Sequence, residues 1–259
     1  MDFTLVMTAS VNPNGMGGLS PESVANREDQ YIKTLCFYKS LHCVKRILFC
    51  ENSSWDLSRI KATSEAQKGC TVEWLSIDAN AYPRRWGKGY GEMLMMDKVC
   101  EYISAARPRD LMIKVTGRFP ILNIGKLIDE FSSRSALNFA IDIIDHPLYD
   151  WLGLRWRSHA ARTICYAVSI EFYKIHIHGM YTQIPKPYWG AEELMMAVWQ
   201  RSKNALGVYP RFKHEPIMSG YAGGERKTWF MATNYGGGLY AVKRSIRQLA
   251  RWFFPFLWL

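Results

Sequence analysis

The chain has 259 residues, of which 48% are hydrophobic and 22% are charged, and its formal net charge at pH 7 is +10. This composition excludes a disordered chain, and the length allows a substantial core in one α/β domain with a terminal extension. The excess of cations indicates a polyanionic neighbour, such as nucleic acid, an anionic membrane surface or a phosphate-bearing substrate. No window reaches the ~18 consecutive apolar residues that span a bilayer, and nothing resembles a cleavable leader, so we expect a cytoplasmic protein.

The first half of the chain alternates short apolar strands with helices. Strands are predicted at 3–7, 46–50, 71–77 and 111–115, and helices at about 22–41, 56–68 and 91–106. In the second half, strands are predicted at 136–144 and 163–168, and a helix at 189–202. The alternation is typical of a Rossmann-type α/β fold, a mostly parallel sheet with helices on both faces. We predict one domain over residues 1–238 and a separate tail over residues 239–259.

Short, mostly polar segments follow three of the predicted strands. They are Thr8, Ala9 and Ser10 after the first strand, Glu51, Asn52 and Ser53 after the second, and Thr116, Gly117 and Arg118 after the fourth. Ligands of open parallel sheets bind beyond the carboxyl ends of the strands. We therefore expect these residues to line a ligand site.

Two segments place a cation beside glycine. They are Gly87-Lys88-Gly89-Tyr90-Gly91-Glu92 and Lys114-Val115-Thr116-Gly117-Arg118-Phe119. Glycine lets backbone N–H groups approach a ligand closely, and Lys or Arg supplies charge for phosphate oxygens. Lys88, Lys114 and Arg118 are expected to stabilise a diphosphate by fixed positive charge. The alternative is that they are solvated surface cations, which fits Lys88 better than Lys114 on its apolar strand.

The sequence lacks a clear Asp-x-Asp element, which often holds a divalent cation beside a diphosphate. The nearest candidates are Asp142 and Asp145, three residues apart. On a strand this odd spacing points the two carboxylates to opposite faces, so they would not converge on one ion. A site for Mg²⁺ or Mn²⁺ is therefore left open but is not required.

Acidic residues near the predicted site supply candidates for a general base. The segment Trp189-Gly190-Ala191-Glu192-Glu193 opens a helix, and Glu192 or Glu193 is predicted to take a proton from an acceptor hydroxyl. The alternative is that both carboxylates only favour the helix dipole. Glu92 is a further acidic candidate, for a ribose contact or for the start of a helix. His214 is predicted to contact the acceptor or the diphosphate, although a lone histidine is more often structural.

Residues 239–259 are predicted to form an amphipathic helix in a membrane interface. Val242, Ile246, Leu249 and Phe253 share one helical face, and Lys243, Arg244, Arg247 and Arg251 share the other. The chain then ends in aromatic residues, and tryptophan is typical of the boundary between lipid and water. The alternative is that this helix packs on its own domain or on another subunit, so a homo-oligomer is left open.

In their order along the chain, three segments resemble motifs of bacterial glycosyltransferases that build surface polysaccharide, namely lipopolysaccharide O-antigen or capsule. The segments are Glu51-Asn52-Ser53, residues 87–92 and residues 114–119, and the resemblance covers about residues 1–225. It implies a GT-A-like fold without the usual Asp-x-Asp, which puts metal dependence in doubt. It also implies a nucleoside pocket at residues 8–10 and 51–52, cations near the sugar or diphosphate, and a catalytic carboxylate within 189–193.

We therefore expect an inverting glycosyltransferase, peripheral on the inner face of the cytoplasmic membrane. It would transfer a sugar from a nucleotide-sugar, with a UDP-sugar favoured, to a lipid-linked oligosaccharide. The predicted donor-binding residues are Thr8, Ala9, Ser10, Glu51, Asn52, Lys88, Gly89, Glu92, Lys114, Thr116, Gly117 and Arg118. The alternatives are a basic nucleic-acid-binding protein and a non-catalytic peripheral membrane protein.

Overall fold

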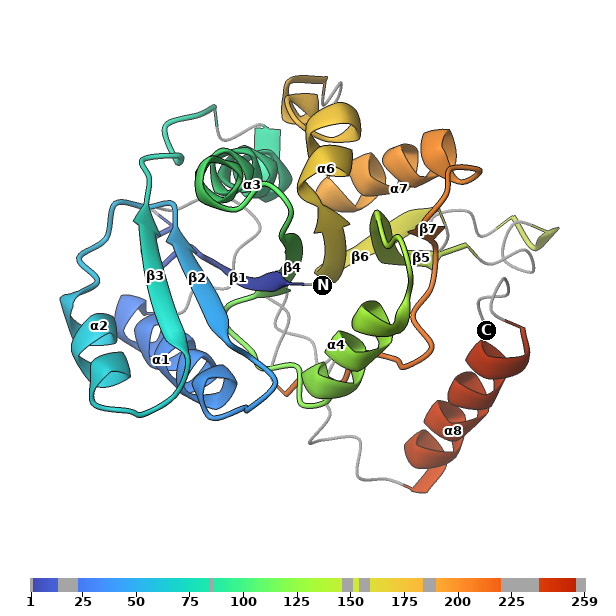
Figure 1. Ribbon diagram of the computed structural model, residues 1–259, viewed down its shortest axis with the longest axis horizontal. Coiled ribbons are helices and arrows are strands. Elements are labelled where there is room, and N and C mark those ends of the chain that lie inside the picture. Colours follow the sequence, from blue (N-terminus) through green and yellow to red (C-terminus); the bar gives the residue numbers. More distant parts are fainter. Residues whose placement is uncertain are drawn as a thin grey trace.

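The computed structural model describes residues 2–13, 23–83, 86–145, 151–153, 159–183, 190–219 and 238–254. Within these ranges one seven-stranded sheet has the order β3-β2-β1-β4-β6-β5-β7 (Figure 1). The strands are β1 (Phe3–Ala9), β2 (Arg46–Glu51), β3 (Thr71–Ser76), β4 (Leu111–Thr116), β5 (Phe139–Ile144), β6 (Ala160–Ser169) and β7 (Val208–Tyr209). β1 to β4 are parallel, whereas β6 is antiparallel to both β4 and β5. The predicted class, an α/β fold with a mostly parallel sheet, is confirmed.

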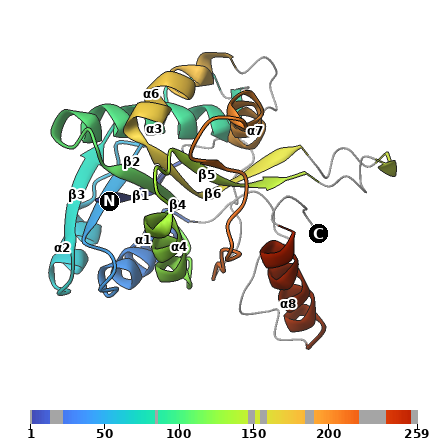
Figure 2. The same cartoon turned by 45° about the vertical axis from the view of Figure 1, so that its right-hand side comes forward.

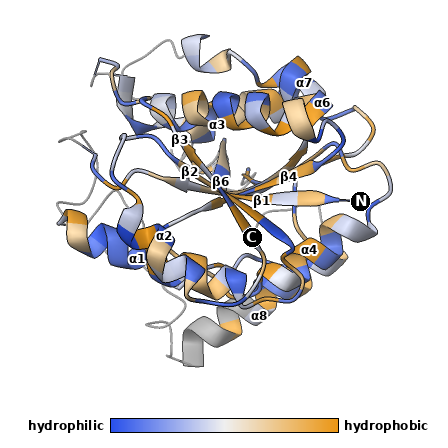
Figure 3. Cartoon of the chain, turned by 60° about the vertical axis from the view of Figure 1, so that its left-hand side comes forward, coloured by the Kyte–Doolittle hydropathy of each residue, from blue (hydrophilic) through white to orange (hydrophobic). Residues whose placement is uncertain are grey.

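Helices cover both faces of the sheet. They are α1 (Val24–Lys39), α2 (Ser58–Glu65), α3 (Gly87–Ala106), α4 (Ile124–Ser133), α6 (Ile170–His176), α7 (Ala191–Ser202) and α8 (Gly238–Phe253), with a 3₁₀ helix at Met180–Gln183. Viewed along the sheet, α3, α6 and α7 form the layer on one side, and α1, α2 and α4 form the layer on the other (Figure 3).

The central strands are buried on both faces because successive side chains of a strand point to opposite sides. Leu5 and Met7 of β1 belong to the core cluster shared with α1 and α4. Val6, between them, belongs to the cluster shared with α3, α6 and α7. This two-sided burial explains why β1 reads in the sequence as a continuous apolar run.

Helix starts differ from the prediction by a few residues. α1 begins at Val24, where the Ser23 hydroxyl accepts a hydrogen bond of 3.2 Å from Asn26 N–H. α3 begins at Gly87, so the glycine-rich segment 87–92 is helical. The predicted start near residue 91 is therefore four residues too late.

Helix α8 lies apart from the two layers, on the side of the sheet that carries α4 (Figures 2 and 3). It is attached through Arg251, which is 4% exposed and donates to both carboxylate oxygens of Asp142 in β5 at 2.8 Å. Within the ranges that the structure describes, no helix combines the length and apolarity needed to cross a bilayer.

Candidate functional site

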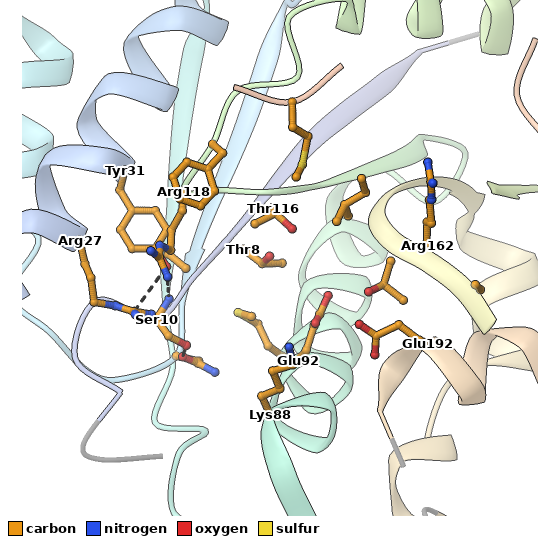
Figure 4. Close-up of a pocket in the computed structure, with 18 of the residues that line it drawn as sticks. Thr8, Ser10, Arg27, Tyr31, Lys88, Glu92, Thr116, Arg118, Arg162 and Glu192 are labelled. Carbon is orange, nitrogen blue, oxygen red and sulfur yellow. Dashed lines mark hydrogen bonds between the residues drawn. The ribbon is translucent and has the colours of Figure 1, made fainter. Parts of the chain in front are cut away.

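A cavity of about 350 Å³ opens beside the carboxyl ends of β1 and β4 (Figure 4). Its wall includes residues from the ends of β1, β2 and β4, from the first turns of α3 and α7, and from β6. Of the residues predicted from the sequence, those in the wall are Thr8, Ala9, Ser10, Asn52, Lys88, Glu92, Thr116, Arg118 and Glu192. The cavity therefore lies where ligands of open parallel sheets are expected.

One end of the cavity is organised around Ser10, directly after β1. The Ser10 N–H donates to the Tyr31 hydroxyl at 2.9 Å, and the Ser10 carbonyl accepts from Arg27 Nε at 3.1 Å and from Arg27 Nη2 at 2.9 Å. The Ser10 hydroxyl donates to Asn52 Oδ1. Side chains of α1 thus fix the backbone at the end of β1 (Figure 4).

Glu51 lies behind this corner and does not belong to the cavity wall. It is fully buried, and its carboxylate accepts backbone N–H groups of Val11 at 3.1 Å, Ser53 at 2.9 Å and Trp55 at 3.1 Å. The Ser53 hydroxyl also donates to it. A carboxylate with this many donors holds the loops after β1 and β2 in shape, so the structure places Glu51 in a supporting position.

Two of the predicted glycines are needed for close packing. A Cβ atom on Gly89 would collide with the backbone of Gly190 and Ala191, where α3 meets the start of α7. A Cβ atom on Gly117 would lie 2.7 Å from the Thr8 carbonyl oxygen and 3.1 Å from the Tyr31 ring. Gly89 therefore brings α3 against α7, and Gly117 brings the ends of β1 and β4 together.

Lys114 is placed behind the cavity wall. Its side chain is 1% exposed, and its ammonium group pairs with Glu92 and donates to the Thr163 carbonyl at 2.6 Å. The Lys114 ammonium, for which the sequence predicts a contact with a diphosphate, thus has partners within the protein and does not line the cavity. Lys114 instead holds Glu92, which does line the cavity.

The two glutamates at the start of α7 have different surroundings. Glu193 Oε2 accepts the Gly190 N–H at 2.8 Å and so caps the helix. Glu192 lines the cavity near Glu92 and Lys88 (Figure 4). Burial raises the pKa of Glu192, the negative charges of Glu92 and Glu193 raise it further, and a backbone hydrogen bond and Lys88 act in the opposite direction. A raised pKa is typical of carboxylates that accept protons near neutral pH.

The remaining candidates lie outside the cavity wall. Both oxygens of Asp142 bind Arg251, Asp145 pairs with His159 Nδ1 at 3.2 Å, and His214 contacts Glu130 through its backbone N–H at 3.2 Å and its ring at 3.4 Å. Asp142 and Asp145 therefore do not converge on one ion. The described part of the chain contains no group of three or more His, Cys, Asp or Glu side chains arranged to hold a metal.

Comparisons with known proteins return similarities of structure only. No family model and no curated sequence matches the chain. Mouse xyloside xylosyltransferase 1 aligns with a TM-score of 0.47 and 10% identity over 81% of this chain and 84% of its own. A cytidylyltransferase from Leptospira borgpetersenii aligns with a TM-score of 0.44 and 9% identity over 82% of this chain and 76% of its own. The bifunctional glycosyltransferase WbbM aligns with a TM-score of 0.45 and 11% identity over 77% of this chain and 37% of its own. All three TM-scores lie below 0.5, so these similarities do not indicate a function for this chain.

The wall also contains residues that were not singled out from the sequence, among them Arg27 and Tyr31 of α1 and Arg162 of β6. Arg27 and Tyr31 are four residues apart and therefore share a face of the helix that follows β1. That spacing is the signal that would have identified them. Trp189, the first residue of the predicted segment 189–193, lies outside the described residues.

Proposed function

We propose that this protein is a glycosyltransferase that moves a sugar from a nucleotide-sugar, with a UDP-sugar favoured, to an acceptor hydroxyl. The observation that carries the proposal is Glu192, a carboxylate with a raised pKa in a cavity that also contains Lys88, Arg27 and Arg118. A nucleotide-sugar needs positive charge for its departing diphosphate, and its acceptor needs a base. The cavity holds both kinds of group.

In the proposed reaction the acceptor oxygen attacks the anomeric carbon while the bond from that carbon to the diphosphate breaks. Glu192 takes the proton of the acceptor hydroxyl, and arginine and lysine side chains stabilise the charge that develops on the diphosphate. Attack opposite the leaving group inverts the configuration of the sugar. Lys114 holds the Glu92 carboxylate, and burial together with the charge of Glu92 raises the pKa of Glu192.

Thermal stability with a panel of nucleotides tests the proposal. At about 100 times its dissociation constant, a ligand adds about 2.7 kcal/mol to the free energy of unfolding. We expect UDP and UDP-sugars to raise the melting temperature more than nucleosides without phosphate do, and we would repeat the measurement with Mg²⁺, Mn²⁺ and EDTA. No response to any nucleotide, together with steeply salt-dependent binding of oligonucleotides, would contradict the proposal and support a nucleic-acid-binding protein.

We further propose that the acceptor is a lipid-linked oligosaccharide of bacterial O-antigen or capsule synthesis and that α8 binds the membrane surface. The apolar face of α8 points away from the domain, with exposed fractions of 56% for Val242, 56% for Ile246 and 71% for Phe253. Its described cations face inward, since Arg251 binds Asp142 and Arg247 binds Glu215 at 3.2 Å. Apolar and aromatic insertion, more than these two cations, would therefore supply the affinity for lipid.

Sedimentation with liposomes of neutral and anionic lipid tests this role. Replacement of Trp252 and Phe253 by Ser removes exposed apolar area from α8, so we expect the double variant to lose most of its binding to vesicles. The matched control replaces Ile175 and Leu206, which are 67% and 81% exposed on other elements, by Ser. Equal pelleting of both double variants would contradict a membrane role for α8, and a smaller oligomer only in the α8 variant would assign this face to self-association.

A further inference from the structure

One guanidinium in the cavity wall has a buried donor without a partner. Arg27 is 2% exposed, and its Nε and Nη2 both donate to the Ser10 carbonyl. Its Nη1 is buried and has no hydrogen-bond acceptor within the described protein. A buried donor left unsatisfied on a charged group is costly, so such groups usually have a ligand or another partner.

The charge of Arg27 also affects what this corner can bind. Among the described residues, no carboxylate forms an ion pair with it; Glu51, a buried carboxylate of this corner, is occupied by the N–H groups of Val11, Ser53 and Trp55. A guanidinium stays charged at any physiological pH. A neutral carbonyl would satisfy the free N–H but not the charge, whereas a phosphate oxygen satisfies both.

A second buried arginine lines the same end of the cavity. Arg118, after β4, is 6% exposed, and its Nε donates to Gln30 Oε1 at 2.8 Å. Gln30 is three residues after Arg27 on α1, so both guanidinium groups belong to the corner where α1 meets the ends of β1 and β4 (Figure 4). Burial raises the pKa of the Tyr31 hydroxyl, and the charges of Arg27 and Arg118 both oppose that rise. The amino end of α1, which favours negative charge, begins three residues before Arg27.

From this geometry we infer that Arg27 and Arg118 form the diphosphate subsite of the cavity, with Arg27 Nη1 donating to a phosphate oxygen. The inference rests on the proposed function and deepens it. Phosphate would then bind at the α1 corner, at the opposite end of the cavity from Glu192 (Figure 4). It would not bind at Lys114, whose ammonium group is occupied by Glu92 and Thr163.

Binding of inorganic pyrophosphate, UDP and uridine by calorimetry tests this subsite. For Arg27→Gln we expect about 10- to 100-fold weaker binding of pyrophosphate and UDP and unchanged binding of uridine, because only the first two carry phosphate. Arg118→Gln should act in the same direction. Arg27→Lys keeps the charge but not the paired N–H donors of the guanidinium group, so its binding of pyrophosphate and UDP should weaken less. The matched control is Arg59→Gln, which removes an arginine that binds Glu28 and Asp29 away from the cavity.

Each outcome bears separately on the subsite and on the proposed function. Melting temperatures without ligand show whether each variant is folded. If Arg27→Gln does not fold, the binding measurements on Arg118→Gln test the subsite. Unchanged pyrophosphate binding in folded variants, or an equal loss for uridine, would overturn the subsite and leave the glycosyltransferase proposal standing. Wild-type protein that binds pyrophosphate through both arginines but no nucleotide would support the subsite and contradict the proposed function. Absence of all binding would contradict both.

Discussion

Replacement of Glu192 by Gln is expected to lower the rate of sugar transfer by about 10²- to 10⁴-fold, which is the usual contribution of a general base. Gln preserves the size of the side chain and its place in the cavity wall but cannot accept the acceptor proton. Binding of UDP should be nearly unchanged, because the proposed phosphate contacts lie at the other end of the cavity. The matched control is Glu193→Gln, since Glu193 caps α7 through the Gly190 N–H and does not line the cavity.

The pH dependence of kcat/KM supplies a second measurement of the same base. Glu192 must be deprotonated to act, so activity should rise with pH through a pKa that burial and the charge of Glu92 place above the ordinary range of glutamate. Lys88 lowers this pKa, so Lys88→Gln should move the acid limb of the profile to higher pH. Full activity in Glu192→Gln, or an acid limb that does not move in Lys88→Gln, would contradict the assignment.

The strands at the centre of the fold were predictable because their burial is visible in the sequence. β1, β2 and β4 are covered on both faces and read as continuous apolar runs. The start of α3 was not predictable, because glycine ordinarily interrupts helices, and only the approach of α7 shows why Gly89 is needed. Local propensity carries no information about a neighbour that lies about a hundred residues further along the chain.

The site was predictable as a region but not as a set of contacts. Strand ends located Thr8, Ser10 and Thr116 correctly in the wall, because the topology alone brings those positions together. The sequence could not show that Glu51 and Lys114 are occupied by partners inside the protein. Nor could it show that Arg27 Nη1 has no acceptor among the described residues, since each of these facts depends on long-range packing.

Replacement of Arg251 by Leu is expected to destabilise the protein by about 3–5 kcal/mol, the usual cost of leaving one partner of a buried ion pair alone. Asp142 is fully buried, and Arg251 supplies two hydrogen bonds of 2.8 Å to it, while Arg162 lies 3.7 Å away. The matched control is Arg247→Leu. Arg247 is 25% exposed and pairs with Glu215, so its loss should cost no more than about 1 kcal/mol. Urea denaturation at pH 7 measures both changes.

The same pair should make stability depend on pH. Burial alone would raise the pKa of Asp142, but the charge and hydrogen bonds of Arg251, with the charges of Arg162 and Arg211, hold it below the ordinary value. A lowered pKa in the folded state contributes stability that is present above the unfolded pKa and is lost as pH falls through the folded pKa. This acid-sensitive part should disappear in the double variant Asp142→Asn, Arg251→Leu, which should also recover much of the stability lost in Arg251→Leu.

The double variant also separates the attachment of α8 from the stability of the domain. Arg251→Leu and the double variant should both release the helix, but only Arg251→Leu should destabilise the sheet, because it alone leaves the Asp142 charge without its main partner. Proteolysis within α8, followed over time, reports release, and urea denaturation reports the sheet. Equal stability of the two variants would show that the charge of Asp142 is satisfied by Arg162 and Arg211, and that the Asp142–Arg251 pair orients α8 without supporting the core.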